Sequence, residues 1–182
     1  HALISNEADM VLANLTVPPE RKQAGSFAKP YVKVSIGVVS PKKKVITKAS
    51  QLKGKSLIVT KGTTAENYFT TKQKGVTLQK YDSKTQQFNA LKNGRAAALA
   101  DDNSYLFAWV KNHKNYKVGI KTLGPNQYIA PGIKKGNKNL TSWMNKEITK
   151  LNKKGFFKKD YNDNLKPYFG SDVKPSDIII TK

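Results

Sequence analysis

The chain has 182 residues, of which 38% are apolar, so it can form one large domain or two small ones around a core. It carries 33 lysine and arginine residues against 12 aspartate and glutamate residues, a formal net charge of +21. Because it contains no cysteine, disulfides, thiol catalysis and cysteine-based zinc sites are excluded. Its apolar runs also fall short of the ~20 residues that a membrane-spanning helix needs.

The positive charge comes almost entirely from lysine, since Arg21 and Arg95 are the only arginines. Such a charge favours anionic partners. Lysine lacks the planar fork with which arginine makes paired hydrogen bonds to bases and phosphates, so a diffuse polyanion is favoured over sequence-specific nucleic acid. The alternative is a lysine-rich surface that serves only to keep the protein in solution.

The first part of the chain predicts three buried strands and one helix. Short apolar runs indicate the strands Asp9–Ala13, Ser35–Val39 and Ser56–Thr60. A helix is expected from Ala65 to about Gln73, with Thr63 or Thr64 as its N-cap. The run Lys42-Lys43-Lys44 follows a proline and predicts a solvated loop.

Helices and strands continue to alternate in the second part of the chain. The expected elements are a helix Ser83–Asn93 ending at Gly94, a strand Ala96–Ala100, a helix from Asp102 to about Asn112, a strand Tyr128–Ile133 and a long helix from about Lys138 to Lys154. The tail, residues 156–182, predicts a short aromatic helix and a looser end. This alternation predicts an α/β fold.

The sequence offers little for catalysis. His1 and His113 have no visible partner, and Asp101-Asp102 is the only pair of adjacent carboxylates. No phosphate-binding glycine motif occurs. We therefore predict neither an enzyme, nor a metal site, nor a cofactor.

Four features instead suit a free amino acid, which carries a carboxylate and an ammonium on one carbon. Arg21 and Thr16 lie near a strand end, and the Thr64 N–H opens a helix, where anions bind. Asp102 follows a strand, so it can accept from the ammonium. The simpler alternatives are a surface ion pair of Arg21 with Glu20 and helix caps at the other positions.

Six segments resemble a known family in the same order along the chain. They are ADMVLANLTVPPER, SFAKPY, LKGKSLIVTKGTTAENY, ALKNGRAAALADDN, IAPGIKKGN and GFFKKDY. Together they resemble the bacterial extracellular solute-binding proteins of family 3, the polar amino-acid receptors of ABC importers, which have a type II periplasmic-binding-protein fold. The branch that they resemble most includes cystine or cysteine receptors and adhesins that bind collagen or mucus.

The resemblance implies two lobes joined by a hinge, with the ligand between them. One lobe would combine residues 1–32 with 128–182, and the other would be continuous over 33–127. The ligand residues implied are Asn14, Thr16, Arg21, Thr63, Thr64 and Asp102. The resemblance also implies an amino-acid ligand, an ABC permease as partner, no cofactor, and an extracellular location, membrane-anchored as a lipoprotein or wall-associated.

The alternative function is a cell-surface adhesin of the same fold. It would bind mucin, collagen or teichoic acid through lysine-rich faces. The candidate residues are Lys42, Lys43, Lys44, Lys134, Lys135, Lys153, Lys154, Lys158 and Lys159. Nucleic acid is not expected as a partner, since no aromatic-rich strand typical of an RNA-binding sheet occurs.

Two departures from the family pattern carry further expectations. Ser26 stands where the family usually has an aspartate before Phe-Ala-x-Pro-Tyr. The first lobe is expected to lack the βα units that precede the ADM strand in the family. We therefore expect the 182-residue chain either to associate with itself or to bind amino acids poorly.

Overall fold

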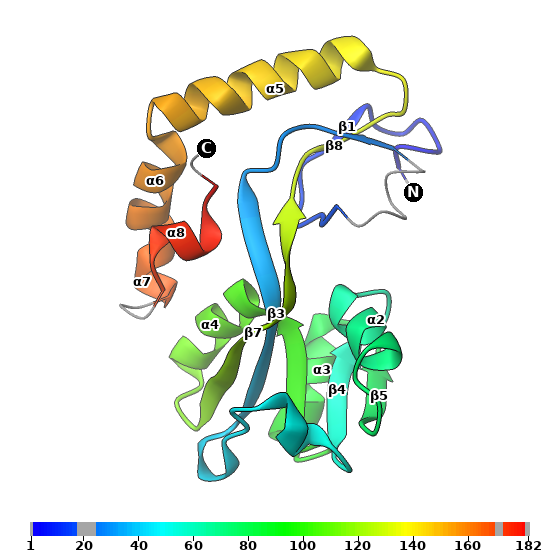
Figure 1. Ribbon diagram of the computed structural model, residues 1–182, viewed down its shortest axis with the longest axis vertical. Coiled ribbons are helices and arrows are strands. Elements are labelled where there is room, and N and C mark those ends of the chain that lie inside the picture. The colour runs from blue at the N-terminus through cyan, green and yellow to red at the C-terminus, as the bar shows by residue number, and fades with distance from the viewer. Residues whose placement is uncertain (1, 18–24, 170–172, 181–182) are drawn as a thin grey trace. The chain divides into compact units, whose positions relative to one another are not determined.

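The computed structural model describes residues 2–17, 25–169 and 173–180. The chain forms two compact units, one of His1–Val34 with Asn126–Lys182 and one of Ser35–Pro125. It enters the second unit within strand β3 (Val32–Pro41) and leaves it within strand β7 (Tyr116–Ile129). Each unit has its own sheet (Figure 1).

The second unit is built on a five-stranded sheet of order β5-β4-β6-β3-β7. Strand β4 (Ser56–Thr60) runs parallel to both β5 (Thr77–Tyr81) and β6 (Ala98–Asp102), while β3 runs antiparallel to β6. The carboxyl ends of β4 and β6 therefore lie at the same edge of the sheet. Ligands of open α/β sheets bind at such an edge.

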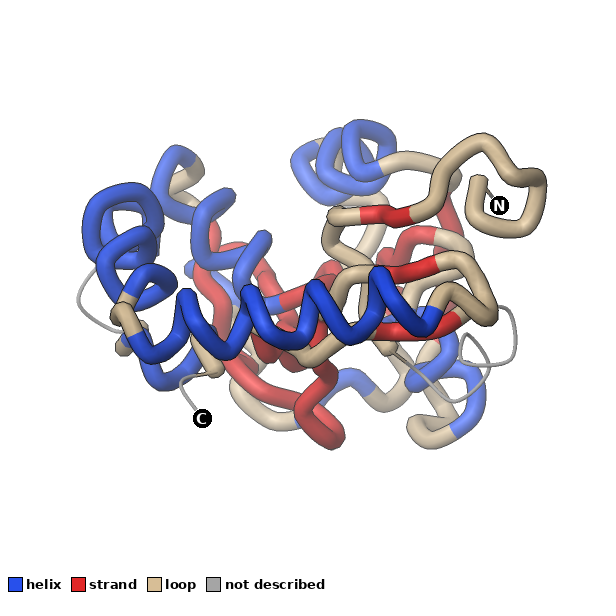
Figure 2. Tube along the Cα trace, turned by 90° about the horizontal axis from the view of Figure 1, so that it is seen from above, coloured by secondary structure: helices blue, strands red, loops and turns tan. Residues whose placement is uncertain are grey.

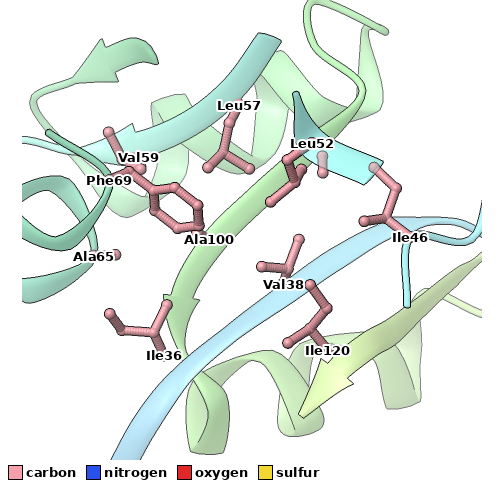
Figure 3. Packing of buried hydrophobic residues seen from close by; sticks show 11 residues of the cluster. Ile36, Val38, Ile46, Leu52, Leu57, Val59, Ala65, Phe69, Ala100 and Ile120 are labelled. Atoms are coloured by element: carbon pink, nitrogen blue, oxygen red, sulfur yellow. The ribbon is translucent and has the colours of Figure 1, made fainter. Parts of the chain in front are cut away.

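Helices cover both faces of this sheet because strand side chains alternate between the faces. Leu57 and Val59 of β4 pack in one cluster with Phe69 of α2 (Thr64–Thr71), as Figure 3 shows. Ile58, between them in the strand, packs in a second cluster with α3 and α4. These helices span Lys84–Lys92 and Asn103–Asn112. Burying a side chain such as Phe69 contributes about 1.5–3 kcal/mol.

The first unit contains a small antiparallel sheet of order β1-β8-β2. Its strands are Met10–Val11, Gly132–Ile133 and Ser26–Phe27. Met144 and Ile148 of helix α5 (Lys138–Lys153) pack against Ile133 of the sheet. Met144 and Ile148 therefore lie on the core-facing side of the long helix, whereas Trp143 is exposed.

Helix α5 is one unbroken helix in Figure 2 and is followed by shorter helical segments. Gly155 ends it with a backbone φ of 68°, a left-handed conformation that glycine adopts without strain. The following segments are α6 (Phe156–Asp160), a π-helical turn (Tyr161–Leu165), α7 (Lys166–Phe169) and α8 (Pro175–Ile178). Buried Tyr161 anchors them, since its hydroxyl donates to the Val173 carbonyl at 2.6 Å.

The structure corrects several expected elements. The predicted strand Ala96–Ala100 lies two residues later, at Ala98–Asp102, so both aspartates belong to it. Tyr128–Ile133 is not one strand but the end of β7 and the separate β8, on either side of Pro131. Lys42–Lys44 forms an exposed 3₁₀ turn rather than a loop, and a second such turn spans Ala49–Leu52.

We expect Gly119→Ala to destabilise the second unit strongly. A Cβ at Gly119 would lie 2.1 Å from the carbonyl oxygen of buried Ile46, so relief of the clash would require a shift of the main chain. The expected loss in unfolding free energy is about 3 kcal/mol or more. Urea unfolding followed by Trp109 fluorescence in a Trp143→Phe background measures it, because Trp109 lies in this unit.

The matched control is Thr122→Ala, an exposed position on the same strand, which should cost about 1 kcal/mol or less. Equal stability of the two alanine variants would contradict the close approach of Gly119 to Ile46.

Candidate ligand-binding site

The end of β4 leads directly into the N-terminus of α2. Thr63 is the N-cap residue, in extended conformation, and its hydroxyl accepts from the Glu66 N–H at 3.2 Å. The same hydroxyl donates to the Thr60 carbonyl at 2.7 Å. Thr63 therefore fixes the turn between the strand and the helix, as the cap expected from the sequence.

Two backbone N–H groups stay open at this helix terminus. The Thr63 hydroxyl accepts from the Glu66 N–H. Among the described residues, no acceptor contacts the N–H groups of Thr64 and Ala65. The first N–H groups of a helix have no intrahelical partner, and the helix dipole makes that end positive. Thr64 and Ala65 therefore offer two donors to an anion.

The Glu66 side chain occupies another backbone donor near this helix terminus, the Gly62 N–H. Its carboxylate accepts from the Gly62 N–H at 2.6 Å and forms a salt bridge with Lys80 at 2.8 Å. The hydrogen bond from Lys80, followed by that from Gly62, holds the pKa of the Glu66 carboxyl below its usual value. An incoming anion therefore meets the N–H groups of Thr64 and Ala65 rather than that of Gly62.

Asp102 is the last residue of β6 and the N-cap residue of α4. Its side chain makes no capping hydrogen bond to that helix. It is half-buried, at the same edge of the sheet as the start of α2. The simpler expectation, that this carboxylate only caps the next helix, is therefore wrong.

Asp101 points the other way and is buried, with 2% of its surface exposed. Its carboxylate accepts from the ammonium of Lys84, from the side-chain amide of Gln87 and, at 2.8 Å, from the Asp102 N–H. The sequence did not predict that Asp101 would hold Asp102 in place through its backbone N–H. The available signal was strand alternation, which sends neighbouring carboxylates to opposite faces.

Asn103 is a second support that sequence reasoning missed. Its side-chain oxygen accepts from the Ser35 N–H at 3.2 Å, and its amide group donates to the Lys121 carbonyl at 3.0 Å. Buried Asn103 thus holds β3 and β7, the strands through which the chain enters and leaves this unit.

The remaining predicted ligand residues belong to the first unit. Thr16 is 5% exposed and forms an antiparallel bridge with Ile129. Asn14 is exposed. Arg21 lies outside the described residues. Within the second unit, the structure brings Thr63, Thr64 and Asp102 to one edge of the sheet.

The lysines predicted to bind polyanions lie on both units. Lys153 and Lys154 line a groove of about 870 Å³ along α5, together with Lys29 and Lys150. Lys159 pairs with Asp163, which raises the pKa of that lysine. The remaining members of the set are Lys42, Lys43 and Lys44 in the exposed 3₁₀ turn, Lys134 and Lys135 after β8, and Lys158 in α6.

A sequence profile of the bacterial extracellular solute-binding proteins, family 3, matches residues 1–167. The chain belongs to this family. It is 47% identical to the solute receptor for L-cysteine of Neisseria gonorrhoeae, with a TM-score of 0.91 over 98% of this chain and 73% of that one. The cysteine-binding protein from Campylobacter jejuni is 46% identical, with a TM-score of 0.92 over 98% and 72% of the two chains.

A curated relative is the arginine-binding protein 1 of Escherichia coli, 29% identical over 83% of this chain and 63% of its own length. The chain thus spans less than two thirds of that relative. The expected α/β fold of the type II solute receptors is confirmed. Members of the family bind solutes for transport, which agrees with a binding protein rather than an enzyme.

The comparisons give no support to the adhesin alternative or to self-association, since the relatives named here are described as amino-acid receptors. The family is extracellular by its description. Over the part of the chain that the structure covers, every helix is too short or too polar to cross a membrane.

We expect the stability contributed by Glu66 to depend on pH. Because its pKa is lowered in the folded chain, the contribution is present above the unfolded-state pKa of about 4.3 and is lost as the pH falls through the lower folded-state value. Glu66→Gln should therefore lower stability by on the order of 0.5–1 kcal/mol at pH ~7 and have less effect at pH ~3. Urea unfolding at both pH values measures the change.

The control is Glu147→Gln on α5, where the carboxylate is 3.5 Å from Lys150. A loss of stability for Glu66→Gln that is the same at both pH values would contradict the lowered pKa.

Proposed function

We propose that this protein is the extracellular receptor of an amino-acid ABC importer and binds the α-amino and α-carboxylate groups of one amino acid. The N–H groups of Thr64 and Ala65 bind the carboxylate, and Asp102 binds the ammonium. Asn14, Thr16 and Arg21 of the first unit contribute to the same ligand, as the family resemblance implies. The two compact units then correspond to the two lobes of the receptor.

The observation that carries this proposal is the shared edge of β4 and β6. The register pairs Ile58 with Leu99, so Thr60 and Asp101 lie two residues further along the two parallel strands. Neighbouring strands are about 4.8 Å apart. A helix terminus with open N–H donors and a carboxylate that does not cap its helix therefore lie side by side, which suits a zwitterion.

We infer that the ligand is a small thiol amino acid, L-cysteine. Two solved relatives that share almost half of the residues are described as cysteine receptors, and this chain aligns with them over 98% of its length. These 182 residues contain no cysteine, so they cannot form a mixed disulfide with such a ligand.

We expect Asp102→Ala to lower the affinity for L-cysteine at least about thirtyfold, because the ammonium loses its charged partner. Isothermal titration calorimetry under reducing conditions measures the affinity. Arg21→Ala should have a loss of the same order, because the ligand carboxylate loses a cation.

The control is Asp82→Ala, which removes an exposed carboxylate that pairs only with Lys61 at 2.8 Å among the ion pairs of the described residues. It should leave the affinity unchanged. Wild-type affinity in both the Asp102 and the Arg21 variant would disprove the assigned site.

A further inference from the structure

A series of hydrogen bonds, continued through the backbone of Thr60, joins the two halves of the candidate site. At one end, the Asp102 N–H donates to the Asp101 carboxylate at 2.8 Å. The same carboxylate accepts from the side-chain amide of Gln87, which projects from α3. The position of Asp102 thus depends on a group in another element.

The chain continues from Gln87 to the helix terminus. The Gln87 side-chain oxygen accepts from the Thr60 hydroxyl at 2.7 Å. The Thr60 carbonyl accepts from the Thr63 hydroxyl at 2.7 Å, and Thr63 in turn accepts from the Glu66 N–H. In this series of bonds, Gln87 is therefore the side chain that contacts both Asp101 of β6 and Thr60 of β4.

The environment of Gln87 fixes its orientation. The residue is fully buried at 0% exposure, between a hydroxyl donor on one side and a carboxylate on the other. A reversed amide would direct its oxygen at the Asp101 carboxylate, where no donor would remain for it. Lys84 also contacts that carboxylate and offsets its charge. Buried networks with every member satisfied are rigid, because each alternative leaves a polar group unpaired.

We propose that Gln87 is a positioning residue that sets the separation between the ammonium-binding Asp102 and the carboxylate-binding terminus of α2. It thereby selects ligands that carry both groups on one carbon. The inference rests on the proposed function for its ligand, whereas the hydrogen bonds that carry it lie within the second unit alone.

The test compares three probes: L-cysteine, cysteamine, which lacks the carboxylate, and 3-mercaptopropionate, which lacks the ammonium. In Gln87→Leu the affinity for L-cysteine should fall about tenfold or more, as expected for the loss of buried hydrogen bonds to a charged group. The affinities for the two single-group probes, measured by NMR titration, should stay within about twofold. A general loss of folded structure would lower all three equally.

The matched control is Gln86→Leu, the exposed neighbour on α3, whose side chain accepts only from the Asp82 N–H among the bonds described. It should leave all three affinities unchanged. If Gln87→Leu does not fold, Thr60→Val breaks the next bond of the same chain and should show the same selective loss. Retained affinity for L-cysteine in the folded variant overturns the proposal.

The amide NMR signals of Asp102 and Glu66 provide a readout that needs no ligand. Both should shift in free Gln87→Leu and in free Thr60→Val, and neither should shift in Gln86→Leu. Unchanged signals overturn the positioning role, even if the wild type binds no probe. Absence of binding by the wild type, with shifted signals, overturns the proposed function alone.

Discussion

The buried carboxylate of Asp101 is the interaction on which the geometry of the second unit's edge depends. A charge with 2% exposure costs several kcal/mol unless it is paired and hydrogen-bonded. Lys84, Gln87 and the Asp102 N–H meet that requirement from α3 and from the strand itself. The bonds that satisfy this one charge thus connect α3 to the ends of β4 and β6. The positions of the candidate ligand residues depend on these bonds.

Apolar packing brings these polar groups together in the first place. Leu57, Ile58 and Val59 are fully buried, as are Ala98 and Leu99 on the neighbouring strand. Their burial favours this parallel register, since a slip of one residue would turn every side chain to the opposite face and change its packing partners. Beyond the apolar runs, Thr60 and Asp101 come next on each strand. The polar edge is therefore a consequence of where the two apolar runs end.

Local signals predicted much of this from the sequence. The strand Ser56–Thr60, the Thr63 cap and the long helix ending at Gly155 are recognisable from apolar runs and turn residues within a few positions. Strand β5 was not predicted, because as an edge strand it is mostly polar and partly exposed. Most of β7 was missed because it contains Gly124 and Pro125, which usually end a strand.

The hydrogen bonds that hold the candidate ligand residues in place could not be predicted, because the bonded residues are distant from one another in the sequence. Lys84 and Gln87 precede Asp101 by 17 and 14 residues, and Asn103 contacts a residue 68 positions away. The net charge of the chain does not identify these residues either. A net charge of +21 exerts no net attraction on a zwitterion whose own charges cancel. Selection of such a ligand must then depend on the spacing of two opposite charges, which a buried neutral amide such as Gln87 can fix and exposed lysines cannot.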